Sequence, residues 1–139
     1  MVQGTASRAG HRLRIDASLG GGVVVVNGEG SFVAMGHLGI GRAFDEWLIG
    51  GEASLWVVPS NDVQGTFAAT ATRGLTSHVE LGAGIGLHLG GGIGPAAELV
   101  LRYWIHPLSL YLRYDGALLL HDNTRDGQNT GTVGIEAHF

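Results

Sequence analysis

The chain of 139 residues contains no cysteine and no lysine, only three prolines, and few charged residues of either sign. Without cysteine there is no disulfide framework and no thiolate chemistry. Charged residues make up 14%, against about 25% in soluble domains, and the formal net charge of −4 argues against nucleic acid as a partner. The longest apolar runs, such as Val23–Val26 and Ala117–Leu120, fall far short of the ~18 residues of a membrane helix. The 45% of hydrophobic residues is therefore spread along the chain, as strands would spread it.

Glycine is abundant, with 25 copies, which disfavours helices, and no Gly-X-Y repeat suggests collagen. The length corresponds to one domain. The first residues, Met1–Arg8, have no apolar h-region, so we expect no signal peptide here and treat the chain as a mature or recombinant form. We expect residues 1–10 to be a flexible N-terminal segment and residues 11–139 to form the folded domain.

The last ten residues, Thr130–Phe139, alternate without a break between apolar and polar side chains. Successive side chains of a strand point to opposite faces, so this segment predicts a strand with one apolar and one polar face. The same period-2 pattern recurs along the chain between turn signals, and no helical pattern of comparable length competes with it. The predicted strands are about His11–Val26, Ser31–Arg42, Trp47–Val58, Thr66–Arg73, Ser77–Leu89, Ala96–His106, Leu108–His121 and Thr130–Phe139.

The polar faces decide which side of this sheet lies inside. In a soluble lipocalin-like barrel the apolar face lines the interior, and the exterior should be rich in Lys and Glu. Here the polar faces carry few charges, of both signs, among Gly, Ser, Thr and His. We therefore expect them to line a narrow eight-stranded barrel in which buried charges pair, with Gly82, Gly84 and Gly86 making room for long side chains from opposite strands. The expected lumen charge network is Arg12, Arg14, Asp16, Glu52, Glu80, Glu98, Arg102, Arg113, Asp115 and Glu136.

This pattern resembles the small outer-membrane β-barrels of Gram-negative bacteria, of the OmpA or OmpX type. The resemblance is architectural, covers about residues 11–139 and rests on strand number, face alternation, aromatic positions and a closing strand that ends in Phe139. It implies an all-β fold: an eight-stranded antiparallel up-and-down transmembrane β-barrel with a polar, side-chain-filled interior, located in the bacterial outer membrane. It also implies contact with membrane lipid, and recognition of Phe139 by the barrel-assembly machinery.

The apolar faces place aromatic and basic residues where membrane interfaces would lie. With both ends of the barrel chain in the periplasm, Arg42 and Arg73 fall at periplasmic strand ends, where they can snorkel. The expected outer loops are Asn27–Gly30, Pro59–Gly65, Gly90–Pro95 and Asp122–Asn129, longer than the periplasmic turns Ala43–Glu46, Gly74–Thr76 and that around Pro107. The expected aromatic girdle is Trp47, Tyr103 and Phe139 near the periplasmic rim, with Phe32 and Phe67 near the outer rim.

Candidate chemistry is sparse, and we expect no catalytic residue, no metal ligand and no cofactor-binding residue. His78 and His88 share a face but lie on the order of 33 Å apart along one strand, too far for a shared metal. His121-Asp122-Asn123 and Glu136 resemble the relay of lipid A deacylase barrels, yet Asn123 stands where the nucleophilic Ser should be. The glycine-rich stretches lack the helix start and the Lys of a phosphate loop.

The sequence thus favours a non-catalytic outer-membrane barrel with a plugged lumen and a structural or anchoring role, acting as a monomer without cofactor. Three alternatives stay open. The barrel could be a narrow pore, the C-terminal membrane domain of a longer protein, or a soluble lipocalin-like ligand-binding barrel. Lumen bulk from Trp56, Trp104 and Tyr111 favours the plugged form.

Overall fold

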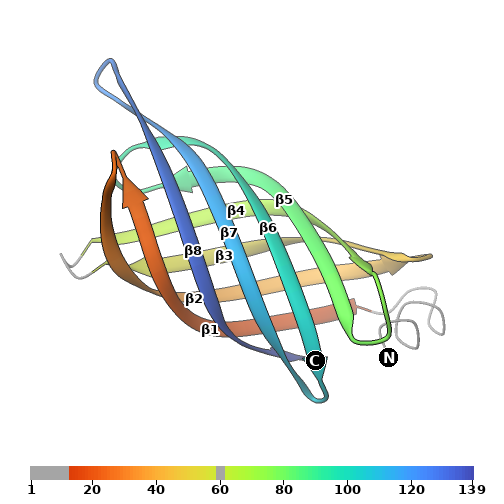
Figure 1. Cartoon of the computed structure of the whole chain (residues 1–139). Coiled ribbons are helices and arrows are strands. Elements are labelled where there is room, and N and C mark those ends of the chain that lie inside the picture. The colour runs from red at the N-terminus through yellow and green to blue at the C-terminus, as the bar shows by residue number, and fades with distance from the viewer. Residues whose placement is uncertain (1–12, 59–61) are drawn as a thin grey trace.

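The computed structural model describes residues 13–58 and 62–139, which form one closed antiparallel barrel (Figure 1). Each strand pairs with the next along the chain, and β8 returns to pair with β1. The predicted eight-stranded up-and-down fold is confirmed, whereas the expected N-terminal segment, residues 1–10, lies outside the described residues. The strands are β1 (Leu13–Val26), β2 (Glu29–Phe44), β3 (Trp47–Val57), β4 (Val63–Gly74), β5 (Val79–Leu89), β6 (Ile93–Ile105), β7 (Leu108–His121) and β8 (Thr124–His138).

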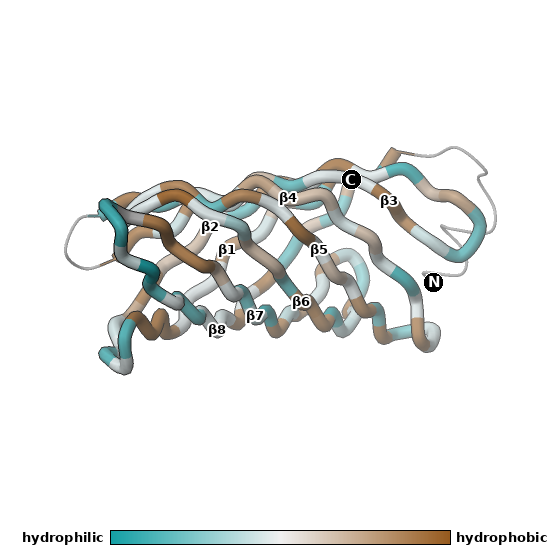
Figure 2. Tube along the Cα trace, turned by 90° about the horizontal axis from the view of Figure 1, so that it is seen from above, coloured by the Kyte–Doolittle hydropathy of each residue, from teal (hydrophilic) through white to brown (hydrophobic). Residues whose placement is uncertain are grey.

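Face alternation governs burial in every strand, and Figure 2 shows hydrophobic and hydrophilic residues alternating along the tube. In β5, Leu81 and Ile85 are exposed, whereas Glu80 and His88 are buried. The polar set therefore points into the lumen and the apolar set points outward, as the alternation predicts. Within the described residues, no helix has the length and apolarity needed to cross a membrane.

The predicted loops are too long, and Asp122–Asn129 is the clearest error. That connection is a turn at Asp122 and Asn123, both at positive φ, and β8 already begins at Thr124. Residues 124–129 pair in register with β7, so their polarity reflects a hairpin that continues past the main barrel (Figure 1) and not a loop. Likewise β4 begins at Val63 and β6 at Ile93, inside the other two long loops predicted, so the connections at both ends of the barrel are short.

The end of β8 is fastened to β1 by main-chain hydrogen bonds. Ile15 N–H donates to the Phe139 carbonyl at 3.0 Å, and Phe139 N–H donates to the Ile15 carbonyl at 2.8 Å. Because the strands run alternately up and down, the β2–β3, β4–β5 and β6–β7 turns lie at the same rim as the start of β1 and the end of β8. We call this rim the C-terminal end and the opposite rim the distal end.

Candidate functional site

Buried ion pairs fill the part of the lumen nearer the C-terminal end. Arg14 of β1 contacts Asp16 on its own strand at 2.9 Å and Glu80 at 2.8 Å, across the lumen on β5. Arg102 of β6 lies 3.6 Å from the same Glu80 and donates through its Nε to Glu136 of β8. Two guanidinium groups and three carboxylates thus form one cluster, which we call the lower cluster.

Arg113 of β7 is the centre of a second group of ion pairs, the upper cluster. Its guanidinium lies 2.6 Å from Glu52, 2.6 Å from Glu98 and 2.9 Å from Asp115. The Arg113 side chain is 2% exposed, and its three partners are almost as well buried. Carboxylates from three strands therefore surround one buried positive charge.

His37 of β2 lies between the two clusters. Its Nε2 is 2.9 Å from Glu52 of the upper cluster, and its Nδ1 is 3.4 Å from Glu136 of the lower cluster. The alternation of β2 puts His37 on the buried face with Met35, but nothing in that strand shows which carboxylates lie opposite, so this role could not be predicted. The structure brings together Arg14, Asp16, Glu52, Glu80, Glu98, Arg102, Arg113, Asp115 and Glu136, while Arg12 lies outside the described residues.

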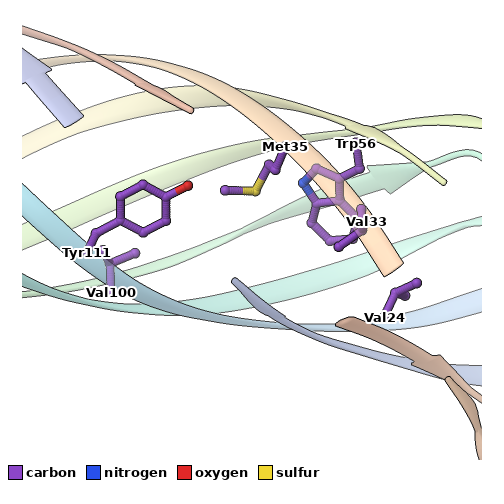
Figure 3. Packing of buried hydrophobic residues seen from close by; sticks show 6 residues of the cluster. All are labelled: Val24, Val33, Met35, Trp56, Val100 and Tyr111. Carbon is purple, nitrogen blue, oxygen red and sulfur yellow. The ribbon is translucent and has the colours of Figure 1, made fainter. Parts of the chain in front are cut away.

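The distal part of the lumen is filled by uncharged side chains. Met35 and Trp56 are adjacent in register on β2 and β3, and Figure 3 shows Met35 between Trp56 and Tyr111. Gln128 donates to Gln64 at 3.0 Å across the lumen. The full buried apolar cluster is Val24, Val33, Met35 and Trp56, together with Val100 and Tyr111, which lie nearer the C-terminal end, in register with Arg113 and Arg102 of the charged clusters.

The space beside the glycines of β5 is occupied by neighbouring atoms. A Cβ atom at Gly84 would lie 2.6 Å from a Glu98 carboxylate oxygen, and one at Gly82 would lie 2.9 Å from the Thr72 hydroxyl. A Cβ atom at Gly86 would lie 1.8 Å from the Phe67 carbonyl oxygen, in the main chain of β4. The room that these glycines provide is thus taken by side chains and by the next strand.

A small polar cavity lies beside the ion pairs, with a volume of about 20 Å³. Asp16, His37, Glu52, Glu98 and Arg102 contribute to its lining. This volume suits a single water molecule in a polar setting. The cavity is far too small for a substrate or for a continuous column of water.

Ser109, His138 and Asp16 form a relay that the sequence did not reveal. The Ser109 hydroxyl is 2.8 Å from His138 Nε2, and His138 Nδ1 contacts Asp16. This is the order of groups in a serine hydrolase. However, Ser109 has no exposed surface, and the Trp104 ring stacks on the His138 ring at 4.0 Å between centroids. No substrate carbonyl can reach the hydroxyl in this arrangement. The three residues lie on β7, β8 and β1, so their contact could be predicted from the sequence only if the strand register were known.

The same end of the lumen holds a group of possible metal ligands. Asp16, Glu136 and His138 place ligand atoms within 4.8 Å of one another. Arg14 and Arg102 already neutralise the two carboxylates, and both ring nitrogens of His138 have partners. A cation would have to displace two guanidinium groups, so the donor set does not suit a metal.

The outer wall is apolar on all eight strands. Among the described residues, exposed Leu, Ile, Val or Phe side chains come from every strand, as at Phe32, Phe67 and Ile85. A continuous band of this kind exceeds the few hundred Å² of apolar patch found on soluble monomers and suits lipid contact. Charges inside and aliphatic side chains outside exclude the soluble lipocalin-like alternative. The five aromatic residues predicted as a girdle, Phe32, Trp47, Phe67, Tyr103 and Phe139, all lie exposed on this wall.

The basic residue at the foot of β4 fits a membrane interface. Arg73 pairs with Glu46 at the C-terminal end of the barrel, and its guanidinium lies 5.6 Å from the centre of the Trp47 ring. An aromatic ring and a paired guanidinium side by side can occupy the zone between hydrocarbon and water.

Comparison with solved structures agrees with this geometry. The barrel matches Neisserial surface protein A (NspA) with a TM-score of 0.66 at 15% identity, over 94% of this chain and 100% of that one. The fold is that of small outer-membrane barrels. Ail, the attachment invasion locus protein of Yersinia pestis, matches with a TM-score of 0.59 at 13% identity, over 94% of this chain and 100% of Ail. A de novo designed transmembrane β-barrel matches with a TM-score of 0.62 at 13% identity, over 95% and 98% of the two chains. No family model and no curated protein matches the sequence.

Proposed function

We propose that this protein is a non-catalytic outer-membrane barrel whose lumen is plugged by its own side chains and which serves as a structural element or membrane anchor. The observation that carries the proposal is the filling of the lumen. Ion-pair clusters occupy one part, an uncharged cluster around Trp56 occupies the other, and the polar cavity between strands has room for one water. Ion flow would require water to replace those contacts along the whole apolar band of about 25 Å.

Planar-bilayer recordings test this proposal. Refolded protein should show no discrete conductance steps, because side chains fill the described part of the lumen and leave little room for water. The double variant Met35→Ala with Trp56→Ala, which removes distal bulk while leaving every charge in place, tests whether this cluster blocks the lumen and should raise the background current. Stable steps from the unaltered chain would favour the alternative of a narrow pore. Loss of those steps in Gly84→Trp would then place the path beside β5.

Further partners follow from the same surfaces. Lipid covers the apolar wall, and we infer that the chain acts as a monomer, since the barrel closes on itself without an open sheet edge in its paired region. Recognition by the barrel-assembly machinery is proposed for Phe139, which is exposed at the end of β8. The distal connections are short, which supports an anchoring role over an adhesive one.

A further inference from the structure

We propose that His37 is an imidazolium latch, whose positive charge holds the two buried ion-pair clusters together and whose loss of a proton in alkaline solution loosens the interior. The inference rests on the proposed plugged lumen, because bulk water around His37 would weaken both of its contacts. It adds a pH-sensitive device to a barrel that otherwise has a static role.

The surroundings of His37 favour a positively charged ring. Nε2 lies 2.9 Å from a Glu52 carboxylate oxygen, while Nδ1 lies 3.4 Å from a Glu136 oxygen and 2.9 Å from the Ser18 hydroxyl. The Ser18 hydroxyl can donate to Nδ1 or accept from it, so this contact fixes no protonation state, whereas each nearby carboxylate repels the lone pair of an unprotonated ring nitrogen. A ring held between two carboxylates is therefore stabilised by protonation.

The charge balance of the lumen points the same way. Three guanidinium groups, on Arg14, Arg102 and Arg113, face six carboxylates. Uncompensated carboxylates are costly in a dry interior, so a further positive charge stabilises this arrangement. The six carboxylates are those of Asp16, Glu52, Glu80, Glu98, Asp115 and Glu136.

The position of His37 makes it a connector. Among the described residues, His37 is the side chain that contacts carboxylates of both clusters, through Glu52 on β3 and Glu136 on β8. Arg113 and Arg102 stand behind these two carboxylates, and Asp16 on β1 borders the same space beside Gly39. If His37 loses its proton, Glu52 and Glu136 face a neutral ring and the clusters repel each other. Water then becomes the replacement partner, and the interior loosens.

Nuclear magnetic resonance of the refolded chain with ¹⁵N-labelled histidine tests the protonation state without any substitution. The His37 ring should show the nitrogen shifts of an imidazolium at about pH 8, where a free histidine with a pKa near 6.5 is neutral. A neutral His37 ring at that pH would overturn the proposal. Because this result does not depend on conductance, failure of the latch and failure of the plug are distinguishable.

Urea titrations across a pH series test the latch itself, with His37→Gln as the variant. A group that binds its proton more tightly when folded stabilises the fold at low pH and loses that contribution as pH rises. The urea midpoint of the unaltered chain should therefore exceed that of His37→Gln at about pH 6 and approach it at about pH 9.

The matched control is His88→Gln, because His88 is equally buried but contacts the Thr66 hydroxyl and the Trp56 ring. The midpoint difference for this control should not shrink with rising pH. A constant difference for His37→Gln, or the same decrease in both variants, would contradict the latch.

Discussion

The Arg113 guanidinium forms ion pairs with three carboxylates in the lumen, those of Glu52, Glu98 and Asp115. The Arg113→Met variant leaves three buried carboxylates without this partner and should destabilise the barrel by about 3–5 kcal/mol. The Glu98→Gln variant removes one of three partners and keeps a hydrogen-bonding amide, so it should cost roughly 1 kcal/mol. Urea titrations of refolded protein, followed by tryptophan fluorescence, measure both.

The control for this pair is Arg125→Met, because Arg125 is exposed near the tip of the β7–β8 hairpin. It should change stability by no more than about 0.5 kcal/mol. If Arg113→Met cost as little as Arg125→Met, the upper cluster would not be a buried ion-pair group.

At this scale the sequence predicts which face a residue occupies but not which residue it meets. Period-2 alternation assigned Arg14 and Glu80 to the lumen. Their contact joins β1 to β5 across the barrel, and such contacts depend on the stagger between strands, which no local pattern encodes. The role of His37 and the Ser109–His138 contact were missed for the same reason.

At the scale of the strands, close packing of β4 against β5 requires a glycine at position 86. Gly86 lies on β5, and a Cβ there would meet the Phe67 carbonyl oxygen at 1.8 Å and the Ala68 Cα at 2.6 Å, both in the main chain of β4. A backbone neighbour cannot rotate away, so Gly86→Ala should destabilise the barrel by about 1–3 kcal/mol. Thermal unfolding monitored by circular dichroism in detergent measures the effect.

Gly131 on β8 provides the comparison, since a Cβ there meets nothing within 4 Å. Gly131→Ala should leave the midpoint unchanged or raise it slightly, because alanine restricts the unfolded chain. Equal effects at the two positions would mean that β4 and β5 do not approach as closely as described.

Element number and type follow from the sequence, whereas element ends do not. Asn27-Gly28 marks a tight turn by chemistry, and β1 and β2 meet there. At the β7–β8 connection, polar residues of a hairpin in water look like a loop, and only the pairing with β7 shows that residues 124–129 continue the strand.

At the scale of the whole molecule, the lumen is divided along its axis. Charged clusters lie toward the C-terminal end, and the uncharged side chains of Val33, Met35 and Trp56 lie toward the distal end. The outer wall carries aliphatic and aromatic residues on all strands. Charged side chains lie inside and apolar side chains outside, the reverse of a water-soluble protein. A lipid bilayer is the solvent that suits this arrangement.

Spin labelling of single-cysteine variants in lipid vesicles tests this arrangement most directly, because the chain has no cysteine of its own to interfere. Labels at Val133 and Ile135 of β8 should be reached by oxygen, which dissolves in lipid, and protected from a water-soluble nickel reagent. A label at Arg125, on the same face of β8 but near the hairpin tip, should be reached by the nickel reagent. Equal access of the nickel reagent to all three positions would contradict a lipid-facing wall and with it the account of this protein as a membrane barrel.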